Sequence, residues 1–303
     1  MSNQAYHIPV LLQECIENLN IKPDGVYVDL TFGGGGHSKA ILKKLDANGK
    51  LFAFDQDEDA FKNALADKRF VLIPQNFRFI KNYLRLNGIK EVDGILGDLG
   101  VSSHQFDSPE RGFSIRFDAE LDMRMNQNSV LTAKQIVNQY TEEKLTSVFK
   151  EYGEIINSKK VAANICKYRI EKQIETTNDL KDALKTCYPK HEENKFLAKL
   201  FQALRIEVNQ EIEALKECLN DCYIILKPQA RLVVISYHSL EDRLVKNLIR
   251  AGNTEGIEER DVIFGTTKKV FKNLTSKPIL PSDAEVAENP RARSAKLRVG
   301  EKL

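Results

Sequence analysis

The sequence predicts an α/β fold, in which a parallel β-sheet with covering helices is interrupted by a long helical insertion. In the first third of the chain, short apolar runs typical of buried strands alternate with helical patterns. This alternation stops near Ser108, helical patterns continue to Cys222, and an apolar strand run returns soon after. One α/β domain divided in the sequence explains this order better than two domains in series. The expected segments are residues 1–107, 108–222 and 223–303.

Five short apolar runs are the predicted strands of the sheet. Helical patterns at 37–45, 57–68 and 77–88 follow the first three of them. Strands and helices that alternate at this spacing form βαβ units, whose strands run parallel. In such a sheet, ligands bind beyond the carboxyl ends of the strands. The predicted strands are residues 26–30, 51–54, 70–73, 93–96 and 231–236.

The predicted insertion consists of helices, because its apolar residues recur at three- and four-residue spacing and we find no convincing strand pattern. Lys227-Pro228 is expected to end the last helix, with a turn into the final strand. The helical patterns cover residues 132–140, 142–152, 158–174, 177–188 and 196–226.

Composition favours a reduced, cytoplasmic protein. The 303-residue chain is 42% apolar and 29% charged, which is ordinary for a globular protein. The N-terminus lacks a basic region followed by an apolar core, and no apolar run reaches the roughly 18 residues of a membrane span. The five cysteines are an odd number without a Cys-x-x-Cys pair, so we expect neither a disulfide framework nor a metal site.

Basic residues gather near the C-terminus, although the net charge of +2 is too small to indicate a nucleic-acid partner. Such a patch either grips phosphates or keeps a surface solvated, and the sequence leaves both readings open. The residues are Arg291, Arg293, Lys296, Arg298 and Lys302, with Lys268, Lys269, Lys272 and Lys277 upstream.

The stretch GGGGH, Gly33 to His37, stands between a predicted strand and a predicted helix. Glycines let the backbone approach a ligand closely, and the helix N-terminus presents free amides and the positive end of its dipole. A tight turn alone would need one glycine, so the four glycines favour a ligand site. We expect Gly35, Gly36 and His37 to form one wall of it.

An acid follows the second predicted strand. Asp55 stands 19 residues after Gly36, where a doubly wound fold binds ribose hydroxyls. Asp57 is a rival for this role, and a surface carboxylate near a helix start is the alternative. The loop matches neither a phosphate-binding Gly-Lys-Ser/Thr motif nor G-x-G-x-x-G. S-adenosylmethionine, which has a ribose but no phosphate, is therefore favoured over NAD, which is not excluded.

The remaining strand ends carry further candidates. Phe77 either covers an adenine face or packs in the core. Asp98 precedes Gly100 and two serines, and we expect chemistry at this loop. His238 is a candidate base or substrate contact. In the alternative reading of this segment, Ser239 caps a helix and Asp242 favours its first turn.

Together, several motifs resemble the ribosomal RNA small subunit methyltransferase H family, also called MraW. The matches run from His7 to Arg298 in the family's order, and FQALRIEVNQE, SYHSLEDR and NPRARS in that order are highly specific. The full set of motifs is HIPVLL, DLTFGGGGHS, DGILGDLGVSS, RGFS, LDMRM, FQALRIEVNQE, SYHSLEDR and ENPRARSAKLR.

The resemblance implies a class I (Rossmann-like) methyltransferase sheet with an inserted all-helical domain at 108–222 that recognises RNA. It also implies transfer of a methyl group from S-adenosylmethionine to N4 of a cytidine in the decoding region of 16S ribosomal RNA, within the small ribosomal subunit. The implied cofactor contacts are Gly35, Gly36, His37, Asp55, Phe77, Asp98 and Gln105. The chain departs from the family pattern at two places. Gly97 stands where the family usually has leucine, and Ala119-Glu120 stands where it usually has Gly-Pro. Both departures bear on the local shape of the loops more than on the chemistry.

For the chemistry, we expect Asp98, or a carbonyl of the loop from Leu99 to Ser102, to accept hydrogen bonds from the target amine. Arg111, Arg116 and Arg124 are candidate phosphate or base contacts, with salt bridges inside the protein as the alternative. Two rival functions are an NAD-dependent oxidoreductase and a non-catalytic RNA-binding factor. Gly35, Asp55 and Asp98 argue against the second rival, and the sequence does not predict the oligomeric state.

Overall fold

The computed structural model describes residues 9–258 and 269–303, and within them the chain forms two compact units. The first unit combines the chain up to Gly100 with the chain from Ile212 onward, and the second runs from Val101 to Glu211. The first is therefore divided in the sequence, as an α/β domain with an insertion requires. The boundaries of the second unit precede the expected 108 and 222.

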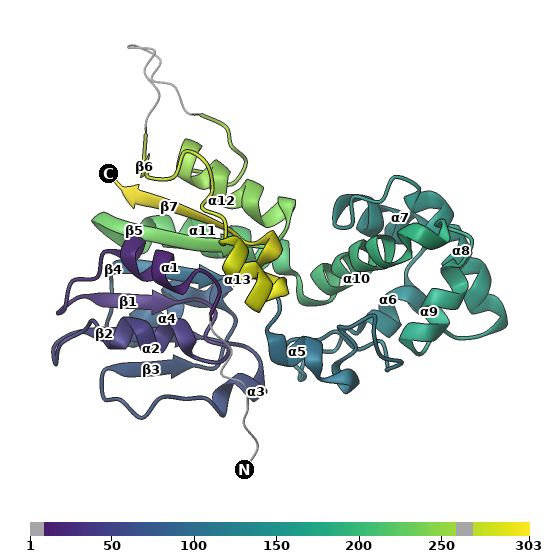
Figure 1. Cartoon of the computed structure of the whole chain (residues 1–303), viewed down its shortest axis with the longest axis horizontal. Coiled ribbons are helices and arrows are strands. Elements are labelled where there is room, and N and C mark those ends of the chain that lie inside the picture. Colours follow the sequence, from purple (N-terminus) through teal and green to yellow (C-terminus); the bar gives the residue numbers. More distant parts are fainter. Residues whose placement is uncertain (1–8, 259–268) are drawn as a thin grey trace. The chain divides into compact units, whose positions relative to one another are not determined.

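The described strands of the first unit form one seven-stranded sheet in the order β3-β2-β1-β4-β5-β7-β6 (Figure 1). The first five strands in this order run parallel, and β7 runs antiparallel to both β5 and β6. The strands are β1 (Val26–Asp29), β2 (Lys50–Phe54), β3 (Phe70–Ile73), β4 (Val92–Asp98), β5 (Leu226–Ser236), β6 (Phe271–Asn273) and β7 (Lys296–Lys302).

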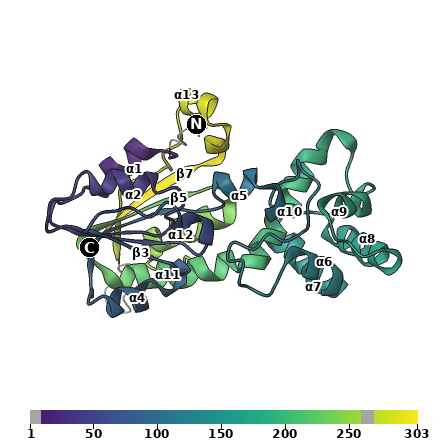
Figure 2. The ribbon, with the colours of Figure 1, turned by 90° about the horizontal axis from the view of Figure 1, so that it is seen from below.

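Helices cover both faces of this sheet, which buries the apolar side chains of its central strands (Figure 2). Helices α1 and α2 pack together over one face, while α4 and α11 lie on the other. Two ion pairs, Arg78–Glu217 and Lys81–Asp221, join the α4 segment to α11. The helices of this unit are α1 (Leu12–Leu19), α2 (Gly36–Leu42), α3 (Glu58–Phe61), α4 (Ile80–Leu86), α11 (Glu211–Ile225), α12 (Ser239–Ala251) and α13 (Asp283–Glu288), with 3₁₀ turns η1 (Phe77–Phe79) and η4 (Pro290–Ser294).

The second unit is all-helical around one core that extends from Phe113 to Val208. Threonines cap three of its helices, because each hydroxyl accepts a hydrogen bond from a first-turn amide. Residues 101–211 are all described, and their β-structure is limited to one isolated bridge, Glu120–Thr176. The elements are α5 (Ser103–Asp107), η2 (Pro109–Arg111), α6 (Ala133–Gln139), α7 (Glu142–Glu151), α8 (Ser158–Glu171), α9 (Thr177–Leu184), η3 (Lys190–Glu192) and α10 (Glu193–Asn209).

Three predicted helix boundaries were wrong. The helix expected at 57–68 is the single turn α3, and Asn63 beyond it donates to the Gly33 carbonyl. The run expected at 196–226 divides into α10 and α11 at Gln210, which is left-handed with φ 51°. No separate turn precedes the final parallel strand, because β5 begins at Leu226 and absorbs Pro228 in a bulge where no ladder N–H is required.

The sequence prediction missed β6 and β7. It treated Lys296–Lys302 as a charged tail, whereas this segment lies between β5 and β6 in the sheet. The available signal was the alternation of Leu297 and Val299 with charged residues, since both apolar side chains are fully buried. None of the described helices combines the length and apolar character needed to cross a bilayer.

Candidate functional site

Polar and aromatic side chains follow each of the five parallel strands of the first unit at its carboxyl end. The glycine loop follows β1, Asp55 follows β2 and Phe77 follows β3. Asp98 is the last residue of β4, and Tyr237 directly follows β5. Because parallel strands end at one edge of the sheet, this edge brings together the glycine loop, Asp55, Phe77, Asp98 and Tyr237.

The four glycines of the loop after β1 have different structural roles. Gly33 and Gly35 have positive φ values of 51° and 73°. A Cβ at Gly35 would stand 2.9 Å from the Phe32 ring, and one at Gly36 would stand 2.1 Å from Pro9. At Gly33 and Gly34 an added Cβ would meet nothing within 4 Å. Thus the two glycines predicted as ligand contacts are those that tolerate no side chain, and their neighbours border open space.

Asp29, at the end of β1, anchors this loop and was not among the predicted site residues. It is fully buried, and its carboxylate accepts hydrogen bonds from the Thr31 amide (3.1 Å) and the Ser38 hydroxyl (2.6 Å). Burial raises its pKa above the ordinary value. The sequence did contain a signal for this role: Asp29 is an acid that directly follows the apolar Tyr27-Val28 and precedes a glycine loop.

Asp55 ties the second strand to the glycine loop. Its Oδ2 accepts the Gly33 amide at 2.8 Å and its Oδ1 accepts the Asp57 amide at 2.9 Å. Burial raises its pKa to about 6, in spite of these two hydrogen bonds. Asp57 instead caps α3 by accepting from Asp59. Asp55 is only partly buried whereas Asp57 is buried, so Asp55 is the more accessible of the two acids for a ligand.

Asp98 lies between a tyrosine and a histidine. The Tyr237 hydroxyl donates to Asp98 Oδ1 at 2.7 Å, and the Asp98 amide donates to the Thr31 hydroxyl. His37 is buried, its Nε2 lies 3.1 Å from the Val10 carbonyl, and its Nδ1 lies 3.9 Å from Asp98 Oδ2. A carbonyl partner requires a proton on Nε2 of His37.

His238 has the structural role that was predicted for Ser239. His238, not Ser239, is the N-cap of α12, and its Nδ1 accepts from the Glu241 amide. Its Nε2 lies 3.2 Å from Glu241 Oε1 but is buried without a hydrogen bond. Asp242, expected to favour the first turn, also pairs with Arg298. The predicted role of His238 as a base or substrate contact therefore gains no geometric support.

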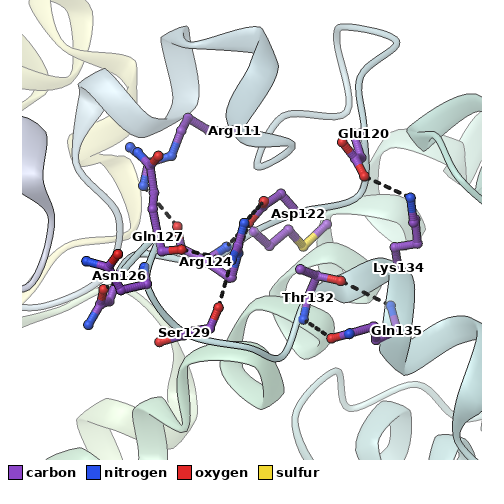
Figure 3. Close-up of polar contacts among 12 residues, drawn as sticks. Arg111, Glu120, Asp122, Arg124, Asn126, Gln127, Ser129, Thr132, Lys134 and Gln135 are labelled. Atoms are coloured by element: carbon purple, nitrogen blue, oxygen red, sulfur yellow. Dashed lines mark hydrogen bonds and ion pairs between the residues drawn. The ribbon is translucent and has the colours of Figure 1, made fainter.

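Two of the three candidate arginines in the second unit are used inside the protein (Figure 3). Arg111 is buried and donates to the carbonyls of Arg124 and Met125. Arg124 binds Asp122 through two nitrogens, at 2.8 and 2.7 Å, and also donates to the carbonyls of Gln127 and Ser129. Arg111 and Arg124 thus brace the loop from Asp122 to Ser129. Contacts inside the protein were the alternative to RNA contacts that the sequence left open. Arg116 is exposed.

Gln105 and Phe77, both expected at the cofactor, differ in their surroundings. Gln105 belongs to the second unit, is buried, and closes a capping box on α5 by accepting the Ser102 amide. This hydrogen bond satisfies the amide oxygen of Gln105 within the protein. Phe77 begins the 3₁₀ turn after β3, where Asn76 accepts from the Arg78 amide, and its ring is half-buried. Their cofactor contacts remain predictions.

Two residues of the expected basic patch form hydrogen bonds inside the protein. Arg298 is buried in β7 and donates to Asp242 at 2.6 and 3.0 Å. Lys302 donates to the Leu226 carbonyl and lies over the Tyr223 ring, and burial lowers its pKa. Lys268 lies outside the described residues, and the exposed cations of this region are Lys269, Lys272, Lys277 and Arg293.

The two departures from the family pattern are accommodated locally. A Cβ at Gly97 would stand 3.2 Å from Leu30, so a larger residue there requires that side chain to move. Ala119 and Glu120 lie against the start of α9, where the Ala119 carbonyl accepts from Thr177 and Glu120 pairs with Lys134.

Comparison with known proteins identifies the family. Residues 4–303 match the model of the MraW methylase family. The chain belongs to this family. A ribosomal RNA small subunit methyltransferase H of Flavobacterium johnsoniae is 59% identical over all of this chain and 99% of its own length. Proteins with the same name in Phocaeicola vulgatus and Christiangramia forsetii are 54% and 56% identical, and each alignment covers at least 98% of both chains.

As a member of the MraW methylase family, the chain is a methyltransferase with a class I fold, and S-adenosylmethionine is its methyl donor. The residues at the strand ends fit this cofactor. Gly33 and Gly34 leave open space beside the loop, and Asp55 retains lone pairs for ribose hydroxyls. The half-buried Phe77 ring offers an apolar surface to an adenine.

Proposed function

We propose that this chain methylates N4 of a cytidine in the decoding region of 16S ribosomal RNA within the small subunit. The observation that carries the proposal is Asp98, a carboxylate held by Tyr237 at the end of β4 in a methyltransferase sheet. The full-length relatives named ribosomal RNA small subunit methyltransferase H support the substrate class.

The cofactor would be held by the residues at the ends of β1, β2 and β3. Gly35 and Gly36 would bring the backbone close to it, Asp55 would accept hydrogen bonds from the ribose, and Phe77 would cover the adenine. When bound, S-adenosylmethionine supplies a methyl group on a positively charged sulfur, and transfer of that group leaves the sulfur neutral.

The target amine is a weak nucleophile because its lone pair is delocalised into the cytosine ring. Asp98 would accept a hydrogen bond from an amine N–H and so turn the lone pair toward the methyl group. Such orientation contributes up to about 7–11 kcal/mol in favourable cases. The new N–C bond leaves the nitrogen positively charged, and Asp98 would hold its acidic proton until water removes it. This role requires Asp98 in the ionised form.

We also propose that the helical second unit, with the exposed Arg116, holds RNA outside the reacting base. Shape and phosphate contacts dominate the recognition of structured RNA, and an exposed guanidinium suits phosphate. Arg111 and Arg124 would contribute indirectly, because they fix the loop from Asp122 to Ser129.

The test is transfer of labelled methyl groups to small subunits, and to their free RNA, from a strain that lacks this modification. We expect one methyl group per particle, located by nuclease digestion and mass spectrometry as N4-methylcytidine. The Asp98→Ala variant is the matched control and should transfer almost none. Absence of transfer from the wild-type chain to both substrates, or transfer to a different base, would reject the proposal.

A further inference from the structure

Tyr237, which was not a predicted site residue, is fixed at two points beside Asp98. Its hydroxyl donates to Asp98 Oδ1 at 2.7 Å. Its backbone amide donates to Glu241 Oε2 at 2.9 Å, and Glu241 is buried in the first turn of α12. The phenol is therefore directed at the carboxylate by an anchor of its own.

The ring of Tyr237 lies beside the loop after β4. A Cβ at Gly100 would stand 3.4 Å from Tyr237 Cδ2, and Gly100 has a φ of 97° that favours glycine. The Leu99 amide before it donates to the Ile235 carbonyl of β5. Tyr237 thus donates to the carboxylate and lies beside the backbone that follows it.

The electrostatics make this hydroxyl a permanent donor. Burial raises the pKa of Tyr237 far above its ordinary value, and the negative charge of Asp98 adds to the effect. Titratable groups near Asp98 in the described part of the chain include His37, with Nδ1 3.9 Å from Oδ2, and the buried Cys15, whose pKa is raised by burial and by the charge of Asp98. Glu241 faces Tyr237 from α12. Among these groups, Tyr237 donates a hydrogen bond to the carboxylate at every working pH.

We propose that Tyr237 is a positioning residue for methyl transfer, which holds Asp98 in one orientation and favours its ionised form. This inference rests on the proposed function of Asp98. A hydrogen bond to a charged group is stronger than one between neutral groups, and it favours the charged form. The amine would then meet a carboxylate whose rotamer is already set, so little reorganisation accompanies the reaction.

Tyr237→Phe is the direct test, because it removes the hydroxyl and keeps the ring beside Gly100. We expect kcat on small subunits to fall about tenfold, which corresponds to the loss of one hydrogen bond to a charged group. KM for the particle and Kd for S-adenosylmethionine should change less than about twofold. Tyr27→Phe is the matched control: Tyr27 is a buried tyrosine of the same sheet whose hydroxyl accepts the Lys22 amide, and kcat should not change.

Two further measurements separate positioning from a merely structural role. In Tyr237→Phe the acid limb of the kcat profile should move to higher pH, because a carboxylate without this donor takes up its proton more readily. In single-turnover reactions, Tyr237→Phe should have little further effect when combined with Asp98→Asn, because it acts through Asp98. A wild-type chain without activity would reject the proposed function. An active wild type with unchanged kcat in Tyr237→Phe, an unshifted acid limb, or an equal loss in the Asp98→Asn background would each overturn the role of Tyr237.

Discussion

The acids at the strand ends of the first unit and the acid in the braced loop of the second unit are held in opposite ways. Asp55 accepts hydrogen bonds from the backbone amides of Gly33 and Asp57, and burial raises its pKa to about 6. Asp122 is paired with Arg124, whose hydrogen bonds lower the pKa of Asp122 in spite of its desolvation. A carboxylate balanced by a cation stabilises a loop, whereas one held by amides retains the capacity to bind a ligand.

Among the substitutions that test this contrast, replacement of Asp98 is expected to have the largest effect on methyl transfer. We expect Asp98→Ala to lower methyl transfer to small subunits by about 10²–10³-fold, because the acceptor for the amine is lost. The thermal unfolding midpoint should remain within a few degrees of the wild type. Near-normal turnover in a folded Asp98→Ala variant would assign the chemistry to another group, such as a carbonyl of the following loop.

Asp55 should have the next largest effect, on cofactor affinity. Asp55→Ala is expected to weaken S-adenosylmethionine binding by about 10–100-fold in calorimetry, because the ribose loses a charged acceptor. Asp57→Ala is the matched control: it removes the cap of α3, which costs about 1 kcal/mol of stability, and should leave affinity nearly unchanged. A reversal of the two results would move the ribose contact to Asp57.

Removal of Arg124 from the braced loop should lower the stability of the fold and leave the methyl-transfer step unchanged. Arg124→Ala is expected to lower the free energy of unfolding by about 1–2 kcal/mol, because Asp122 and two carbonyls lose their donor. Arg116→Ala should leave stability unchanged and raise KM for the small subunit a few-fold. Urea titration and steady-state kinetics of both variants check this pair. Should Arg124→Ala raise KM without loss of stability, Arg124 contacts RNA after all.

The smallest effect concerns pH. Because ribose hydroxyls donate to an ionised carboxylate, affinity for S-adenosylmethionine should fall as pH drops through about 6, by at most tenfold per unit. The free protein should show the opposite trend. The folded-state pKa of Asp55 is raised, so its contribution to stability is present below about pH 4 and is lost as pH rises through about 6. Calorimetry from about pH 5 to 8 checks the first trend, and Asp55→Asn should abolish it.

Short-range rules placed Gly35 and Asp55 after buried strands, where the structure has them, because a parallel sheet imposes this spacing. The sequence does not separate Asp55 from Asp57, because the amides that each carboxylate accepts depend on how the loop folds. Tyr237 was beyond local patterns, since its partner Asp98 is 139 residues away and the two meet only through the pairing of β4 with β5.

Long-range pairing also bears on readings that the sequence left open. Arg298 and Lys302 fitted either a phosphate-binding patch or a solvated surface, because their charge is visible in the sequence whereas their partners, Asp242 and the Leu226 carbonyl, are not. Arg111 and Arg124 show the same difficulty on a shorter scale. Guanidinium groups donate to phosphates and to backbone carbonyls alike, and only the folded loop decides between them.

The position of β7 has a consequence for the order in which the enzyme becomes active during synthesis. Residues 296–302 are made after every other described strand, yet they pair with the whole second half of β5, ahead of Tyr237. Until they leave the ribosome, β5 is an open edge, prone to pairing with other chains. A nascent chain that already contains Asp98, Asp55 and Tyr237 therefore still lacks the strand that supports its site, and activity should appear only after residues 296–302 have been made and have paired with β5.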